Sequence, residues 1–126
     1  MWIRYQPNPM NDRVGDCTVR ALSHVLDKTW DQTYALLAAY GFIRKDMPSG
    51  NDTWDMMLRD FGFTKHIIPE QCFDGCYTVR DFCEDHPYGS YLLGTGSHVI
   101  AVKDGNYMDA WDSGSEYPIY YYSKEE

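Results

Sequence analysis

The spacing of apolar residues changes once along the chain, near Gly89. Before this point apolar side chains recur every three or four residues, the period of an amphipathic helix, and after it short apolar runs alternate with turn residues, as in strands. This order predicts an α+β fold with N-terminal helices packed on a C-terminal antiparallel sheet. The 126 residues, 44% of them hydrophobic, suffice for one core, so we expect a single domain over residues 1–126.

Residues that favour helix N-termini precede the expected helices. Asp16 is a candidate N-cap for the first, and Thr29 with Gln32 forms a capping box before the second, which Gly41 should end. Residues 5–14, which are rich in Pro, Asn and Asp, should form an irregular loop before the first helix. Four helices are expected, at residues 17–26, 30–40, 51–61 and 78–84.

The clearest strand signal is the pair Asp104-Gly105 between two apolar runs. Asp-Gly favours a two-residue hairpin turn, and such a turn pairs Lys103 with Asn106. This turn fixes the register of the whole hairpin. The expected strands are residues 64–68, 90–93, 98–103, 106–111 and 118–122.

The charge balance restricts the partners of the chain. Eleven basic and 19 acidic residues give a net charge of −8, and no basic cluster exceeds Arg44-Lys45, which argues against nucleic-acid binding. No apolar run approaches the length that spans a membrane, and the first residues lack the pattern of a signal peptide. We therefore expect a cytoplasmic protein with no membrane partner, whose four cysteines stay reduced. The sequence gives no indication of oligomeric state.

Cys17 is the candidate nucleophile. It follows Gly15-Asp16 at the first turn of the expected helix, where backbone N–H groups and the helix dipole stabilise a thiolate. A cysteine buried as part of the core would give the same local pattern, because cysteine is among the most buried residue types. A catalytic interpretation therefore requires a histidine elsewhere in the chain.

His98 is the histidine that Cys17 requires. In the register of a two-residue turn, Ile100 pairs with Asp109 and His98 with Trp111, so that His98, Asp109 and Trp111 share one face. Asp109 would then orient the imidazole through its second ring nitrogen. A bulge or a longer turn would place Asp112 there instead, and we prefer Asp109 on the register argument.

At these residues the chain resembles the papain-like cysteine peptidase superfamily. The resemblance lies in a cysteine that opens the first main helix, a histidine at the start of a later strand, and Asp-Ala-Trp at 109–111 where the family commonly carries Asn-Ser-Trp. It implies a papain-like fold and a Cys17, His98 and Asp109 triad, with Trp111 shielding the histidine from water. The Asp-Cys pair is most similar to the bacteriocin-processing branch, and small proteins of this kind occur among bacterial and phage products.

The resemblance also implies an oxyanion donor upstream of the cysteine. The family carries a glutamine six residues before the nucleophile, and here that position is Asn11, which has the same amide on a shorter side chain. Gln6 is the other candidate. Together with the Cys17 backbone N–H, this amide would stabilise the oxyanion.

The leading hypothesis is therefore a cysteine hydrolase that cleaves a peptide or related amide bond in a peptide or protein substrate, without a cofactor. The alternative is a non-catalytic papain-like scaffold that binds a protein through its acidic, tyrosine-rich surface. A third interpretation is a zinc site, but the chain lacks a Cys-x2-Cys pair and we expect no metal. The zinc interpretation would draw on Cys72, Cys76, Cys83, His86 and His66.

Overall fold

The computed structural model describes residues 1–11, 14–69 and 76–124. Within these ranges the chain forms four helices and one six-stranded mixed sheet of order β1-β5-β4-β3-β6-β2. The α+β prediction is confirmed. The elements are β1 (Trp2–Arg4), α1 (Cys17–Val25), α2 (Trp30–Arg44), α3 (Asn51–Asp60), β2 (Phe63–Ile67), α4 (Val79–Asp85), β3 (Ser90–Gly94), β4 (Val99–Lys103), β5 (Asn106–Asp109) and β6 (Tyr120–Lys124).

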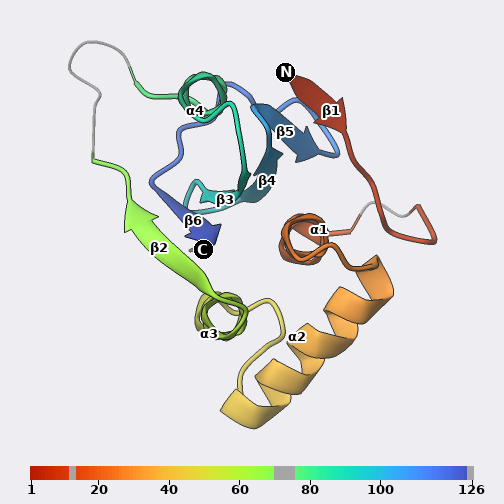
Figure 1. Ribbon diagram of the computed structural model, residues 1–126. Helices are drawn as coiled ribbons and strands as arrows, with labels where there is room; N and C mark the ends of the chain where they lie inside the picture. Colours follow the sequence, from red (N-terminus) through yellow and green to blue (C-terminus); the bar gives the residue numbers. More distant parts are fainter. Residues whose placement is uncertain (12–13, 70–75, 125–126) are drawn as a thin grey trace.

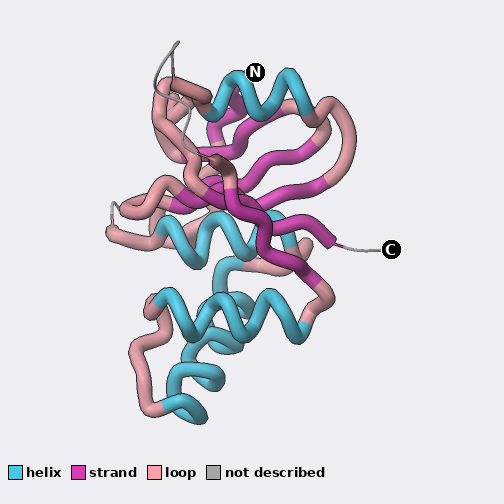
Figure 2. Tube along the Cα trace, turned by 90° about the vertical axis from the view of Figure 1, so that its left-hand side faces the viewer, coloured by secondary structure: helices cyan, strands magenta, loops and turns pink. Residues whose placement is uncertain are grey.

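The sheet lies between α4 on one side and the other three helices on the other (Figure 1, Figure 2). Strand β4 shows why both faces are covered: Val99 and Ala101 pack into the core shared with α1, α2 and α3, whereas Ile100 and Val102 pack into the core beneath α4. Successive strand residues point to opposite faces, so an uninterrupted apolar run suits a strand that is buried on both sides.

The sheet differs from the expected C-terminal antiparallel sheet at one edge. Strand β1 comes from the N-terminus and pairs in parallel with β5, with Trp2 opposite Tyr107 and Arg4 opposite Asp109 (Figure 1). The sheet is therefore mixed. Sequence analysis missed β1 because three residues are too few to show an alternating pattern, and their partner strand lies about a hundred residues away in sequence.

The second helix also departs from its predicted end. It continues past Gly41 to Arg44, and Lys45 in the left-handed region, with φ of 58°, closes it. Gly41 instead allows the loop after the helix to approach closely: a Cβ on this residue would lie 2.9 Å from the carbonyl oxygen of Asp46. Gly41 therefore does not end the helix, and its lack of a side chain allows the following loop to pack tightly against it.

The hairpin register is confirmed next to the turn, with Lys103 opposite Asn106 and Ala101 opposite Met108, but the strand pairing ends before the expected pairs of Ile100 with Asp109 and His98 with Trp111. The strands are shorter than expected at the far end of the hairpin, so that His98 lies just before β4 and Asp109 is the last residue of β5. Both side chains therefore lie at one end of the sheet. No helix among the described residues is long and apolar enough to cross a membrane.

Candidate active site

The start of α1 meets this end of the sheet, and three predicted site residues come together there. Cys17 and His98 lie side by side and line the same two hollows, and His98 Nε2 lies 2.7 Å from Asp109 Oδ2. Because Nε2 faces Asp109, Nδ1 is the ring nitrogen available to Cys17. The geometry is that of a nucleophile, a base and a group that orients the base.

The surroundings of Cys17 favour its thiolate. Burial alone would raise the pKa of the thiol, but the hydrogen bond from His98, a hydrogen bond from the Val99 backbone N–H and the charges of His98 and Arg20 lower it below the ordinary value of 9.0. The pKa of His98 moves in the opposite direction, to about 9: burial opposes the charged ring, but Asp109 and Cys17 together outweigh it. These opposed shifts favour a thiolate–imidazolium pair at neutral pH.

Asp109 is fully buried and its carboxylate accepts four hydrogen bonds. Burial would raise the pKa of this carboxyl, but the bonds from His98 and Ser113 and the backbone N–H of Ala110 hold it below its usual value. Asp109 therefore stays ionised beside His98. The donors are Arg20 Nη2 at 3.0 Å, His98 Nε2 at 2.7 Å, the Ala110 backbone N–H at 2.8 Å and Ser113 Oγ at 2.6 Å.

Arg20 links the helix to this carboxylate. Its guanidinium is buried and donates to Asp109 and, at 2.7 Å, to Asp16 Oδ1. Asp16 also accepts from Trp30 Nε1 at 3.0 Å and makes no side-chain capping bond to the first turn of α1. Asp16 is therefore the N-cap residue of α1, as predicted, but its side chain does not cap the helix, because Arg20 and Trp30 occupy its carboxylate. The first-turn N–H groups beside Cys17 receive no cap from it.

Trp111 covers the histidine as the resemblance implied. Its indole stacks on the His98 ring, with centroids 4.6 Å apart and planes 23° from parallel, and the residue is 50% exposed. One side of the indole therefore contacts the imidazole while much of the ring remains in contact with solvent. A stacked indole restricts both the rotation of His98 and the access of water to its bond with Asp109.

The alternative acid, Asp112, lies outside this cluster. Its Oδ2 lies 3.3 Å from Arg80 Nη2 in an exposed ion pair. Its carboxylate also accepts hydrogen bonds from the Tyr107 hydroxyl and the Gly114 N–H. The structure therefore brings Asp109 to His98 and does not bring Asp112 there. The two-residue turn pairs the strands without a bulge from Lys103 to Ala101, and Asp109 follows at the end of β5, next to the start of β4.

Asn11, the predicted oxyanion donor, lines neither of the two hollows that contain Cys17. It is exposed, has φ of 53°, and lines a hollow with Gln6 and Trp111 that does not include the cysteine. Gln6 Oε1 accepts from the Asn8 N–H at 3.4 Å and lies in that same hollow. Neither amide is placed for the proposed role, because a count of residues along an irregular loop does not fix where a side chain points.

Two hollows adjoin the nucleophile and share Gly15, Cys17, Ser97 and His98. The first, of about 220 Å³, extends toward α3 and β6 and is also lined by Asn51, Trp54 and Tyr120. The second, of about 360 Å³, extends toward Trp111 and Glu116. A chain lying across both hollows would pass directly over Cys17 and His98.

Sequence reasoning missed several of the residues that build the site. Arg20 carried a usable signal, because it lies one helical turn after Asp16 and a charged side chain there interrupts the apolar stripe of α1. Ser113 and Tyr120 carried none, since only the folded chain brings them to Asp109 and to the hollow of Cys17.

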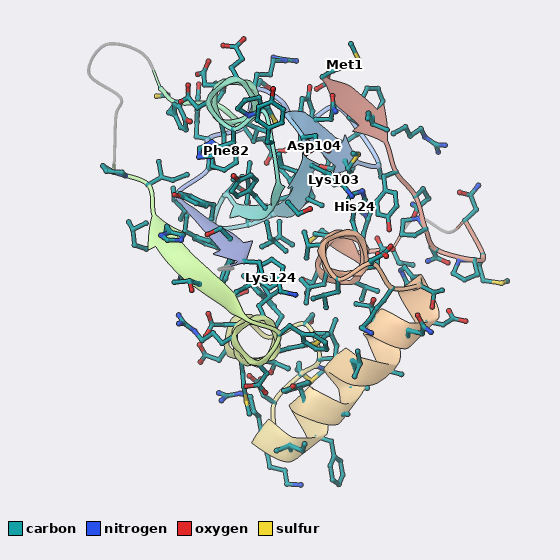
Figure 3. All side chains as sticks on the ribbon, viewed as in Figure 1. Met1, His24, Phe82, Lys103, Asp104 and Lys124 are labelled. Atoms are coloured by element: carbon teal, nitrogen blue, oxygen red, sulfur yellow. The ribbon has the colours of Figure 1, made fainter. Side chains whose placement is uncertain are left out.

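His24, also on α1, belongs to a separate environment. It lies between α1 and the sheet, near Lys103 (Figure 3), where burial and that charge lower its pKa. Its ring meets Tyr5 edge-on at 5.0 Å, and Nδ1 is buried without a hydrogen-bond partner among the described residues. This agrees with a structural role for His24.

The remaining cysteines do not support the zinc interpretation. Cys76 is disulfide-bonded, which contradicts the expectation that all four thiols stay reduced, and Cys72 lies outside the described residues. Cys83 is buried in α4, and His86 Nδ1 bonds with the Phe82 carbonyl at 2.9 Å. In the described part of the chain no group of three His, Cys, Asp or Glu residues could hold a metal ion.

Comparison with protein-family models, curated proteins and solved structures gives no match for this chain. Its function must therefore be inferred from the geometry of the site, because a fold alone does not determine an activity.

Proposed function

We propose that the protein is a cysteine hydrolase that cleaves a peptide or related amide bond through Cys17, His98 and Asp109. The observation that carries the proposal is that Cys17 lies beside His98, whose Nε2 hydrogen-bonds at 2.7 Å to a buried, ionised Asp109. Core packing alone does not require this arrangement, because it brings three ionisable groups together and buries two of them.

The chemistry follows from these contacts. The Cys17 thiolate attacks the substrate carbonyl carbon, forming a C–S bond and placing negative charge on the carbonyl oxygen, which the Cys17 backbone N–H stabilises. The imidazolium of His98 protonates the leaving amine as the C–N bond breaks. His98 then takes a proton from water, which hydrolyses the thioester and regenerates the thiol. Asp109 keeps the ring oriented in both half-reactions and stabilises its charged form before the first and after the attack of water in the second.

Several features of the fold support the papain-like part of this proposal. The nucleophile opens a helix, the histidine precedes a strand of the sheet, and the tryptophan stacks on the histidine. The nearest branch by motif would be the bacteriocin-processing peptidases, and the protein would be a small bacterial or phage product. A peptide or protein substrate and a cytoplasmic location belong to the same proposal, and fractionation of the producing cells tests the location.

The test is cleavage of a mixed peptide library by the wild-type protein and by Cys17→Ser, with new peptide termini identified by mass spectrometry. We expect new termini from the wild-type protein and none from the variant, and circular dichroism should show both proteins folded. Termini that appear equally with both proteins would contradict the proposal.

The alternative function is a non-catalytic scaffold that binds a partner protein. The observation in its favour is an exposed apolar group at the end of α2, where Phe42, Ile43 and Met47 are largely solvent-accessible. A Cys17→Ser variant that stays folded and keeps the full biological effect of the protein would favour this alternative.

A further inference from the structure

The proposed hydrolysis lacks a second donor for the oxyanion. The Cys17 backbone N–H provides one, but Asn11 and Gln6 line a different hollow. Sites of this kind hold the developing negative charge with preorganised donors, and losing one of them costs on the order of 10²–10³ in rate. The missing donor should line the same hollow as Cys17 and have a hydrogen to spare.

Tyr120 meets the first requirement, and its ring is held in place. It is the first residue of β6 and pairs across the sheet with Gly94, where a Cβ would overlap the tyrosine ring. On its other sides the ring stacks with Trp54 at 6.3 Å and meets Tyr122 edge-on at 5.9 Å. Gly94 therefore makes room for a side chain that lines the hollow beside Cys17 and His98.

The Tyr120 hydroxyl also has a hydrogen to spare. None of the described residues hydrogen-bonds to it. Burial and then the negative charge of Cys17 raise the pKa of Tyr120 above its ordinary value of 10.0, so the phenol keeps its proton at neutral pH. Tyr120 and Cys17 line the same hollow. Tyr120 is thus a neutral donor close to the thiolate.

We propose that the Tyr120 hydroxyl donates a hydrogen bond to the carbonyl oxygen of the group attacked by Cys17, as the second oxyanion donor beside the Cys17 N–H. This assignment rests on the proposed function and deepens it. It gives the proposed cleavage a donor from β6 in place of the upstream amide that the resemblance implied.

Asn51 is the competing donor in the same hollow. Its Oδ1 accepts from Trp54 Nε1 at 3.2 Å, which leaves its amide hydrogens available. Its side chain is exposed, however, whereas the Tyr120 ring is fixed by Gly94, Trp54 and Tyr122. Stabilisation of an oxyanion depends on donors that do not reorganise, which favours Tyr120.

Two reagents separate oxyanion stabilisation from thiolate reactivity. With p-nitrophenyl acetate, the thiolate attacks the carbonyl, an oxyanion forms, and the C–O bond then breaks to release p-nitrophenolate and leave an acetyl thioester on Cys17. With iodoacetamide, the thiolate displaces iodide at a saturated carbon and no oxyanion forms. The ratio of the two rates at Cys17, measured by mass spectrometry, therefore reports the oxyanion donors alone.

In Tyr120→Phe we expect acetylation of Cys17 to fall about 10²-fold while alkylation by iodoacetamide is unchanged. Phenylalanine keeps the ring contacts, so the fold should be retained. The matched control is Tyr88→Phe, which removes a hydroxyl from a tyrosine that is 80% exposed, and neither rate should change. Gly94→Ala keeps the hydroxyl but displaces the ring, and it should give the same selective loss.

Three results would overturn the assignment: equal loss of both rates in Tyr120→Phe, no loss of either rate, or a selective loss in Asn51→Ala that Tyr120→Phe lacks. These results leave the proposed hydrolase intact if the wild-type protein is acetylated rapidly at Cys17. If the wild-type Cys17 is acetylated no faster than Cys83, the proposed function fails, and the Tyr120 assignment fails with it.

Discussion

The chain contains two helical cysteines with opposite properties. Cys17 is the first residue of α1 and has a lowered pKa, whereas Cys83, the fifth residue of α4, is 4% exposed and burial raises its pKa to about 11. Cys83 packs with Val79, Leu93 and Ile100 beneath α4. Phe82, its neighbour in α4, lies on the same side, toward the sheet (Figure 3).

Burial opposes the charged form of both thiols, so burial does not explain the difference. Cys17 has His98, the Val99 N–H and the charge of Arg20 beside it, whereas Cys83 lies in an apolar core. The neighbours of a cysteine therefore determine the reactivity of its thiol. The residue type and its position in a helix, which the sequence shows, are only part of the cause.

Replacing His98 should remove the difference in reactivity between Cys17 and Cys83. Of the changes considered, it should have the largest effect on the rate of Cys17 alkylation. In His98→Ala the partly buried thiol of Cys17 loses the interaction with His98 that lowers its pKa, so this pKa should rise. We expect alkylation of Cys17 by iodoacetamide at pH 6 to fall about 10³-fold. Cys83 provides the internal control, and its rate should not change. An unaltered Cys17 rate in the variant would show that His98 does not activate the thiol.

Replacing Arg20 should destabilise the helix start around Cys17. Arg20→Met leaves the buried carboxylates of Asp16 and Asp109 without their shared cation, and we expect a loss of about 3–5 kcal/mol in the free energy of unfolding, measured with urea. Arg80→Met removes the exposed partner of Asp112 and should change stability little. Equal effects of the two variants would contradict the buried network.

Substitutions of Asp109 and Asp112 should have clearly different effects on the rate at which Cys17 is acetylated. Asp109→Asn removes the negative charge that holds the pKa of His98 near 9, and we expect acetylation of Cys17 by p-nitrophenyl acetate at pH 7 to fall about 10²-fold. Asp112→Asn, which alters only the contacts with Tyr107, Gly114 and Arg80, should keep the wild-type rate. A larger loss in Asp112→Asn would reverse the assignment of the acid.

The smallest effect should be the pH dependence of hydrolysis. At the edges of the pH profile, kcat/KM should change about tenfold per pH unit. The leaving amine needs the proton of His98, so kcat/KM should fall as pH rises through about 9. On the acid side the rate should fall only below the lowered pKa of Cys17, since the thiolate must be present. A rate that keeps rising above pH 9 would exclude imidazolium as the proton donor.

Local signals in the sequence predicted the parts of the fold and site that depend on local structure. The Asp104-Gly105 turn predicted the pairing of Lys103 with Asn106 and Ala101 with Met108, and the apolar periods located α1 and β4. Contacts between distant segments were not predictable in this way. The parallel pairing of β1, the bond from Arg20 to Asp109 and the Tyr120 ring over Gly94 join residues that no sequence spacing relates.

Two departures from the expected side-chain roles have the same physical origin. Asp16 has the right residue type and position for a cap, but Arg20 and Trp30 occupy its carboxylate. Asn11 has the right amide at the expected distance in sequence, but the loop directs it to another hollow. In both cases the residue type suited the expected role, and other contacts of the folded chain decided where the side chain lies.

The most direct test of the account is the rate of alkylation of Cys17 and Cys83 by iodoacetamide at pH 6, measured in one sample of native wild-type protein by mass spectrometry. We predict that Cys17 reacts at least about 10²-fold faster than Cys83, and that the two rates become equal in urea. Equal rates in the native protein, or a native Cys17 slower than the unfolded thiol, would contradict an activated thiolate at the start of α1.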